Sequence, residues 1–347
     1  MLVDSLVNEL HLQSNYLHGA SIETIYFGGG TPSQLSIVQL ERLLQTINRL
    51  HQVTTDCEIT FEANPDDISK QYLIDLRNVG INRLSIGIQS FCNEDLKLMN
   101  RRHTSDQAIE AVNDAFSTGF HNLTGDLIYG LPWWRSNSKW ENNLDSFFKL
   151  PFSHLSAYHL SVEPNTVFGD RFKTGQYVQP DEDTSLQQFN LLIDKAEANG
   201  FIHYEISNFA KPDCFAKHNS NYWNQTKYLG LGPSAHSYNG VTRQWNIADY
   251  KEYIASIEAK TIPCTTEILS ATDKTNDYLI THLRTIQGID LLEMEKEFGY
   301  QTVETILKTS KKYIASGLLI ADQNHLILSR KAKFISDSII SDLMFVE

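Results

Sequence analysis

Short runs of β-branched and aromatic residues alternate with stretches of helical periodicity over the first two-thirds of the chain. This alternation is typical of βα units built around a parallel sheet. The predicted strands are residues 22–27, 58–63, 83–88, 122–129, 154–160 and 201–207. Because parallel strands linked by helices need cover on both faces, the pattern predicts an α/β fold, a barrel or open barrel whose strand carboxyl ends meet at one rim.

Residues that cap helices separate these strands. Three pairs have the spacing of a capping box, which closes the first turn of a helix: Ser36 with Gln39, Thr104 with Gln107, and Thr184 with Gln187. Glycines at positions 80, 119 and 200 stand where the carboxyl end of a helix favours a left-handed residue. From about residue 269 the pattern changes to two helices, a glycine-containing hairpin and a helical tail, which predicts a small winged-helix-like domain. We therefore expect a barrel domain over residues 1–247 and an accessory domain over residues 248–347.

The composition narrows the class of protein. The 347 residues are 41% hydrophobic, and 29 Lys and Arg against 42 Asp and Glu give a net charge of −13. A chain this acidic, without a run of basic residues, disfavours nucleic acid as a main partner. It has no apolar stretch of about 18 residues and its first positions are acidic where a signal peptide is basic, so we expect a cytoplasmic protein. The four cysteines form no CxxC pair and predict no metal site.

Polar residues follow four of the predicted strands at the same end. The first strand runs into GGGTP at residues 28–32, whose glycines allow a backbone to approach a ligand closely, although a tight turn needs them equally. The next strands end in Glu62, Gln89 and Asp126, and Arg101 closes the segment after Gln89. Taken singly, each of these residues can be polar simply because the rim of the sheet is in contact with water. Together, carboxylates, an amide and an arginine suit a zwitterionic ligand that carries a ribose.

A second cluster is the motif HNSNYW, which precedes the run YLGLGPSAHS. Its Asn and Ser side chains can satisfy an ordinary loop by themselves. Alternatively, His218, Cys214 or His236 ligates iron, because imidazole and thiolate are the usual axial ligands of haem. Trp133 and Trp134 either line a flat apolar ligand or pack over the mouth of the barrel.

Motifs in order along nearly the whole chain resemble the oxygen-independent coproporphyrinogen III oxidase group of radical S-adenosylmethionine (SAM) proteins. They include YFGGGTP, FEANPDD, RLSIGIQSF, LMNRRH, GDLIYGLP and YLGLGPSAHS, and HNSNYW is similar to the motif of the branch formed by the haem chaperone HemW. The resemblance implies a partial (β/α)6 barrel with a C-terminal accessory domain. It also implies a set of SAM-binding residues: Gly29, Gly30 and Thr31 for the amino end of the methionine, and side-chain contacts from Glu62, Gln89, Arg101 and Asp126. Of the three haem-ligand candidates above, we take His218 as the ligand to be tested.

One part of the family pattern has no counterpart in this sequence. In the family, a strand and a CxxxCxxC loop precede the GGGTP strand, and the three cysteines bind a [4Fe–4S] cluster. The sequence begins in what resembles the helix after that loop, so the first barrel strand is missing as well. None of the four cysteines is a convincing substitute, because Cys57 lies at the entry of its strand, away from the rim, and Cys92 alone could reach it. We expect a start placed too late or a truncated gene, in preference to a shortened paralogue that retains only binding.

The resemblance implies a haem chaperone that binds haem and SAM and passes haem to client proteins, with membrane contact only through those clients. Whether the chain forms a homodimer stays open. Two alternatives are kept: oxidative decarboxylation of coproporphyrinogen III, and a cluster-free module that only binds. Because the sequence lacks the cluster cysteines, we assign no catalytic residue and leave open whether the chain is an enzyme.

Overall fold

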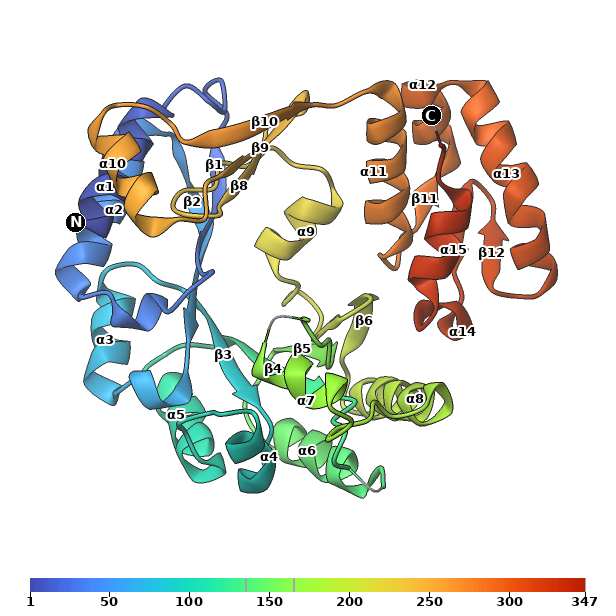
Figure 1. The fold of residues 1–347 in the computed structure, drawn as a ribbon, viewed down its shortest axis with the longest axis horizontal. Helices are drawn as coiled ribbons and strands as arrows, with labels where there is room; N and C mark the ends of the chain where they lie inside the picture. Colours follow the sequence, from blue (N-terminus) through green and yellow to red (C-terminus); the bar gives the residue numbers. More distant parts are fainter. Residues whose placement is uncertain (135, 165, 347) are drawn as a thin grey trace. The chain divides into compact units, whose positions relative to one another are not determined.

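The computed structural model describes residues 1–134, 136–164 and 166–346, and it divides into two compact units (Figure 1). The first unit consists of Met1–Ile25, Ser36–Glu58 and Lys217–Glu347, and the second of Tyr26–Leu35 and Ile59–Ala216. Each unit is described by itself below. The domain boundary expected after residue 247 stays a prediction.

The main sheet is a curled half-barrel of seven strands in the order β1-β2-β3-β4-β5-β7-β6. Its strands are β1 Ile22–Phe27, β2 Val53–Ala63, β3 Arg83–Gln89, β4 Asn122–Tyr129, β5 His154–His159, β6 Ile202–Glu205 and β7 Asn208–Ala210. Strands β2 to β5 pair in parallel, whereas β7 lies between β5 and β6 and is antiparallel to both. All six predicted strands are confirmed as elements, but the sequence analysis missed β7 because three residues carry no periodicity.

The two faces of this sheet differ in chemistry. The helix-covered face is apolar and fully buried, with side chains that include Phe61, Leu84, Ile86, Leu123, Leu127 and Leu155. The opposite face is polar, and cross-strand partners there include Glu62 with Ser85, Thr124 with His154, and Asp126 with Ser156. Parallel strands that are covered on both faces usually consist of continuous apolar residues. The polar face is therefore the unusual feature of this sheet.

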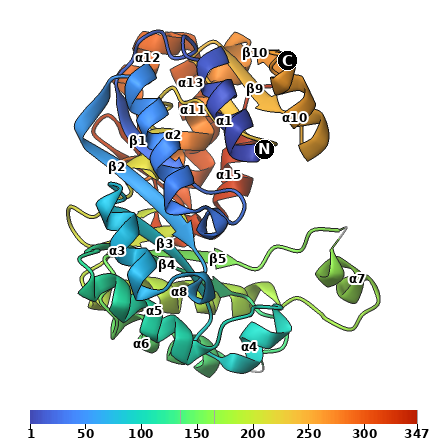
Figure 2. The same cartoon turned by 90° about the vertical axis from the view of Figure 1, so that its left-hand side faces the viewer.

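Helices of the second unit gather on one side of strands β3 to β5 (Figure 1). They are α3 Lys70–Asn78, α4 Asn93–Leu98, α5 Ser105–Ser117, α6 Ser138–Phe148 and α8 Glu182–Ala198, with short 3-10 turns at Pro32–Gln34 and Pro65–Asp67. Helix α7 Val167–Lys173 stands apart from them (Figure 2). The capping box predicted at Thr104 begins α5. The one predicted at Thr184 is wrong, because Asp181 caps α8 and accepts the backbone N–H of Thr184 at 2.7 Å. An aspartate three residues upstream offers the same N-cap chemistry as a threonine.

The first unit opens with α1 Leu2–Leu12 and α2 Ile37–Leu50, which lie side by side (Figure 2). The capping box predicted at Ser36 begins α2. The elements that follow are α9 Lys217–Trp223, β8 His236–Tyr238, β9 Thr242–Asn246, α10 Tyr250–Glu258 and β10 Cys264–Ile268. The three strands form a sheet in the order β10-β9-β8.

The C-terminal part of this unit has the winged-helix-like arrangement that the sequence predicts, but three helices instead of two precede the hairpin and two short helices form the tail. Its elements are α11 Ala271–Leu283, β11 Ile289–Asp290, α12 Leu291–Phe298, α13 Tyr300–Ala315, β12 Leu319–Asp322, β13 His325–Leu328, α14 Arg330–Lys333 and α15 Ser336–Leu343. The predicted hairpin is β12 and β13, but Gln323, with φ of 48°, makes its turn, and Gly317 follows α13 instead. In the described ranges no helix is long and apolar enough to cross a membrane.

A buried carboxylate fastens α1 to the middle of the first unit. Glu9 has no exposed surface, and its oxygens accept the backbone N–H of Gly232 at 2.8 Å and the Tyr253 hydroxyl at 2.5 Å. The amides of Gln13 and Asn246 donate to it at 2.9 and 2.6 Å. Four donors replace the water that this charge loses on burial.

Candidate functional site

The glycine loop leaves β1 in a conformation that side chains would disturb. A Cβ on Gly28 would lie 2.4 Å from the Tyr26 ring and 2.7 Å from Glu62 Oε1. Gly29 has a φ of 76°, a left-handed value that glycine adopts without steric cost. At Gly30 no heavy atom lies within 4 Å of where a Cβ would be, and Thr31 is exposed beside it. The loop is therefore tight at its start and open at Gly30 and Thr31.

Glu62 is the residue that holds this loop to the sheet. Its Oε1 accepts the Tyr26 hydroxyl at 2.7 Å and its Oε2 accepts the backbone N–H of Gly29 at 3.3 Å. Two oxygens offer about four lone-pair sites, so acceptor capacity remains for a ligand. The structure thus gives Glu62 a supporting role that the sequence analysis did not foresee.

Asp126 lies on the polar face of β4 between two serines. The Ser85 hydroxyl is 3.3 and 3.4 Å from its two oxygens, and Ser156 also donates to it. Burial raises the pKa of the Asp126 carboxyl to about 7, and the negative charge of Glu62 adds to the rise against those hydrogen bonds. A carboxyl with this pKa changes charge near neutral pH, and it can accept a cationic or hydroxyl ligand group when it is ionised.

Arg101 and Gln89 complete the set predicted from the sequence. Arg101 follows α4, and burial lowers the pKa of its guanidinium while the charges of Asp126 and Asp66 oppose that change. Gln89 ends β3 with a φ of 66°, a left-handed value rare for a residue with a side chain. Backbone outliers of this kind cluster at binding sites. All seven residues assigned to SAM lie in the second unit, on one loop and on strands and segments of one sheet.

Asp67 supports the segment after the glycine loop and was not predicted from the sequence. It accepts the Ser33 hydroxyl at 2.8 Å, the Asn64 amide at 3.1 Å and Arg102 Nη2 at 2.9 Å. Burial alone would raise the pKa of this carboxyl, but these donors outweigh it and the pKa is lowered. Asp67 therefore ties the segment after GGGTP to the segment after β2. The repeated acid in FEANPDD was the available signal, but nothing in the sequence shows which of two adjacent aspartates turns inward.

His218 lies in the first unit, at the second position of α9. Its Nδ1 is 2.9 Å from the Thr24 hydroxyl and its Nε2 is 3.1 Å from the Tyr222 hydroxyl. Burial lowers the pKa of the ring to about 4. The imidazole is therefore neutral at physiological pH, which is the state that ligates iron.

The other haem-ligand candidates have less support. His236 is exposed on β8, where its ring stacks on Trp245 at 6.1 Å, and Cys214 lies in the loop before α9. The two tryptophans pack and hydrogen-bond within the protein. Trp133 and Trp134 donate their indole N–H groups to the fully buried Asp95 at 2.8 and 3.1 Å.

A [4Fe–4S] cluster needs a set of cysteine thiolates. The four cysteines of the chain are free, namely Cys57, Cys92, Cys214 and Cys264. Burial raises the pKa of Cys57 to about 11, which keeps it a thiol. Among the described residues no group of three or more His, Cys, Asp or Glu is placed to hold a metal ion. The residues present do not fit such a cluster.

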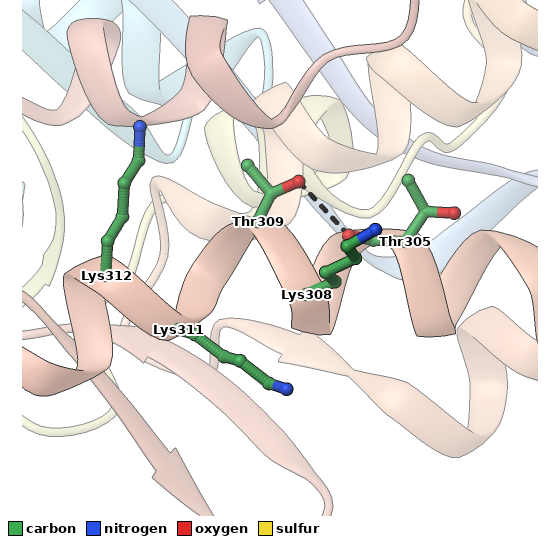
Figure 3. A pocket seen from close by; sticks show the side chains of 5 residues that line it. All are labelled: Thr305, Lys308, Thr309, Lys311 and Lys312. Carbon is green, nitrogen blue, oxygen red and sulfur yellow. Dashed lines mark hydrogen bonds between the residues drawn. The ribbon is translucent and has the colours of Figure 1, made fainter.

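A shallow depression on α13 is lined by five side chains (Figure 3): Thr305, Lys308, Thr309, Lys311 and Lys312. Lys312 pairs with Asp342, and the Thr309 hydroxyl donates to the Thr305 carbonyl at 3.1 Å. Exposed lysines along one helix are an ordinary solvated surface, so this depression is not a candidate site.

Comparison with known proteins supports the family that the motifs indicate. Residues 5–133 match the radical SAM superfamily and residues 269–335 match the HemN C-terminal domain. The heme chaperone HemW of Bacillus subtilis is 32% identical over 320 residues, which cover 92% of this chain and 84% of that protein. The HemW of Escherichia coli is 38% identical over 234 residues, which cover 67% of this chain and 61% of that protein.

A solved structure agrees with the fold. The coproporphyrinogen III oxidase HemN of Escherichia coli, described as a radical SAM enzyme, has a TM-score of 0.85 and 24% identity over 99% of this chain and 82% of its own. The half-barrel and the C-terminal domain thus define a radical SAM protein, a class that implies SAM and a [4Fe–4S] cluster. Within that class, the chain belongs to the family of the heme chaperone HemW.

Proposed function

We propose that this protein is a haem chaperone that binds haem through His218 and delivers it to client proteins. The observation that carries the proposal is the neutral imidazole of His218, held at both ring nitrogens at the start of α9. A neutral imidazole is a usual axial ligand of haem iron. Relatives that share most of the chain's length are named heme chaperones, which supports haem as the cargo.

We further propose that the glycine loop and the polar face of the sheet bind SAM. The open space at Gly30 and the exposed residue Thr31 suit the polar end of the methionine. The carboxylates of Glu62 and Asp126 suit the ribose hydroxyls and the ammonium group of SAM. The guanidinium of Arg101 suits the carboxylate of the SAM methionine. Gln89 adds an amide at the end of β3. These residues would bind and orient SAM, and we assign to them no step in SAM cleavage.

His218→Ala is expected to abolish the Soret shift that appears when ferric haem is added to the full chain. The reason is that the variant removes the neutral nitrogen offered to the iron. The measurement is a haem titration followed by absorbance. His236→Ala is the matched control, because that ring was the other histidine candidate and is exposed. An unaltered spectrum in His218→Ala, or loss of the Soret shift in His236→Ala instead, contradicts the assignment.

Arg101→Ala is expected to weaken SAM binding to the full chain by about ten- to a hundredfold, the usual range for a lost hydrogen bond to a charged group. Equilibrium dialysis with labelled SAM measures it. Arg77→Ala is the control, because Arg77 is an exposed arginine on α3 of the same unit. Equal affinity of wild type and Arg101→Ala removes Arg101 from the site.

Measurements of coproporphyrinogen III conversion and SAM cleavage distinguish a haem chaperone from the two alternative functions. A haem chaperone binds haem and converts little coproporphyrinogen III, whereas an oxidase releases the vinyl product. A binding-only module shows no SAM cleavage even when a CxxxCxxC segment is added before the chain. Transfer of bound haem to an apo-haemoprotein, followed by absorbance, tests delivery to clients directly.

A further inference from the structure

The amino end of α9 is fixed by a carboxylate from strand β2. Glu58, on β2, is only 5% exposed. Its Oε1 accepts the backbone N–H of His218 at 3.0 Å and its Oε2 accepts that of Lys217 at 3.2 Å. The Lys217 ammonium also pairs with Asp56 at 2.9 Å. The backbone that carries His218 is therefore held at a set position on β2.

The ring of His218 is held by two hydroxyls of different character. Thr24, on β1, lies 194 residues away in the sequence and contacts Nδ1. Tyr222 lies one helical turn after His218, contacts Nε2, and packs edge-on against the ring at a centroid distance of 5.1 Å. A hydroxyl can donate or accept, so these contacts allow the ring to carry its proton on either nitrogen.

The two partners of the ring differ in exposure, although Tyr222 also packs edge-on against Tyr228 at a centroid distance of 4.9 Å. The Tyr222 side chain is 42% exposed and sits at the end of a seven-residue helix, whereas Thr24 is half-buried on a strand of the main sheet. Rotation of an exposed side chain is fast and needs no change of backbone. Nε2 is therefore the nitrogen that can be uncovered.

We propose that Thr24 is a positioning residue that fixes the tautomer of His218, and that the Tyr222 hydroxyl covers Nε2 until haem iron takes its place. The inference rests on the proposed function and deepens it. Nδ1–H donates to Thr24 Oγ1, and the Tyr222 O–H donates to the lone pair of Nε2. When ferric haem binds, that hydrogen bond breaks, the Nε2 lone pair forms the bond to iron, and the hydroxyl turns to water. No proton or electron leaves the ring.

A hydrogen bond at Nδ1 makes the imidazole a stronger donor to the metal, and its loss typically weakens a metal site by 10- to 100-fold. Thr24→Val, which keeps the shape and removes the hydroxyl, is expected to weaken ferric haem binding by about tenfold. The midpoint potential of the bound haem should rise, because a weaker donor stabilises the ferric state less. Thr24→Ser restores the hydroxyl and should recover both values.

The control for a general effect on folding is Thr46→Val. Thr46 is a buried threonine on α2 of the same unit, and its hydroxyl donates to the Arg42 carbonyl at 2.8 Å. This variant should leave haem affinity and potential unchanged. Tyr222→Phe should change affinity in the opposite direction to Thr24→Val, about two- to tenfold tighter, since no hydrogen bond has to be broken.

The results separate this inference from the proposed function. If His218→Ala abolishes the Soret shift while Thr24→Val binds haem with the affinity and potential of the wild type, the role of Thr24 is overturned and His218 remains the ligand. Weaker haem binding by Tyr222→Phe overturns the role of Tyr222 as a cover. If His218→Ala itself binds haem normally, the proposed function fails first.

Discussion

Glu9→Ala is expected to lower the free energy of unfolding by about 3–5 kcal/mol, the cost of breaking a buried charged network. The carboxylate accepts hydrogen bonds from Gly232, Asn246 and Tyr253, which lie more than 200 residues further along the chain. Truncation leaves these donors buried and unpaired, and each unpaired group costs about 1–3 kcal/mol before the structure relaxes.

Urea unfolding of the full chain, followed by circular dichroism, measures the change in stability. Glu258→Ala is the matched control, because Glu258 is an exposed glutamate on α10, where a substitution should change stability by no more than about 0.5 kcal/mol. Glu9→Gln should lie between wild type and Glu9→Ala, since its carbonyl still accepts some of the donors. A Glu9→Ala chain as stable as the control shows that the network contributes little.

Asp126→Asn is expected to make the chain more stable at pH 8, by up to about 4 kcal/mol. The pKa of Asp126 is raised to about 7 by burial, against an ordinary value of 3.8. Between those two values the folded state holds a proton that the unfolded state has released. Stability therefore falls as pH rises through this window, and the wild type loses about 3 kcal/mol between pH 5 and pH 8 through this group.

Asparagine has no proton to lose, so Asp126→Asn should lack this part of the pH dependence. Urea unfolding of both chains at pH 5 and pH 8 gives the comparison. Asp106→Asn, an exposed aspartate on α5, should follow the wild type at both values. If wild type and Asp126→Asn lose the same stability between pH 5 and pH 8, the carboxyl is ionised in the folded state throughout, and burial does not raise its pKa.

The local pattern of the sequence was a sufficient guide to the elements of the half-barrel. Strand β4 was predicted with the bounds that the structure has, and the capping boxes at Ser36 and Thr104 begin α2 and α5. These features depend on neighbours within four residues, which the sequence shows directly. The prediction at Thr184 was wrong because Asp181, three residues earlier, is also a good N-cap residue, and only the geometry shows which of the two caps α8.

The hydrogen bonds on the polar face of the sheet could not be predicted from the sequence pattern. Arg83, Ser85 and Gln89 alternate with buried apolar residues along β3, and the alternation is visible in the sequence. Cover on both faces was expected, but how the polar side chains are satisfied depends on register. Arg83 donates to Thr124 at 2.6 Å on the neighbouring strand, a pairing that no single strand reveals.

The amino-acid sequence by itself determined the order of strands and helices, the motifs that mark the HemW family, and the identity of the residues at the strand ends. The tertiary structure alone decided which of them touch: Glu62 with the glycine loop, Asp67 with Arg102, and His218 with Thr24. The physical reason is that secondary structure follows from periodicity over a few residues, whereas a hydrogen bond between distant side chains exists only once register, burial and loop path bring the two groups within about 3 Å.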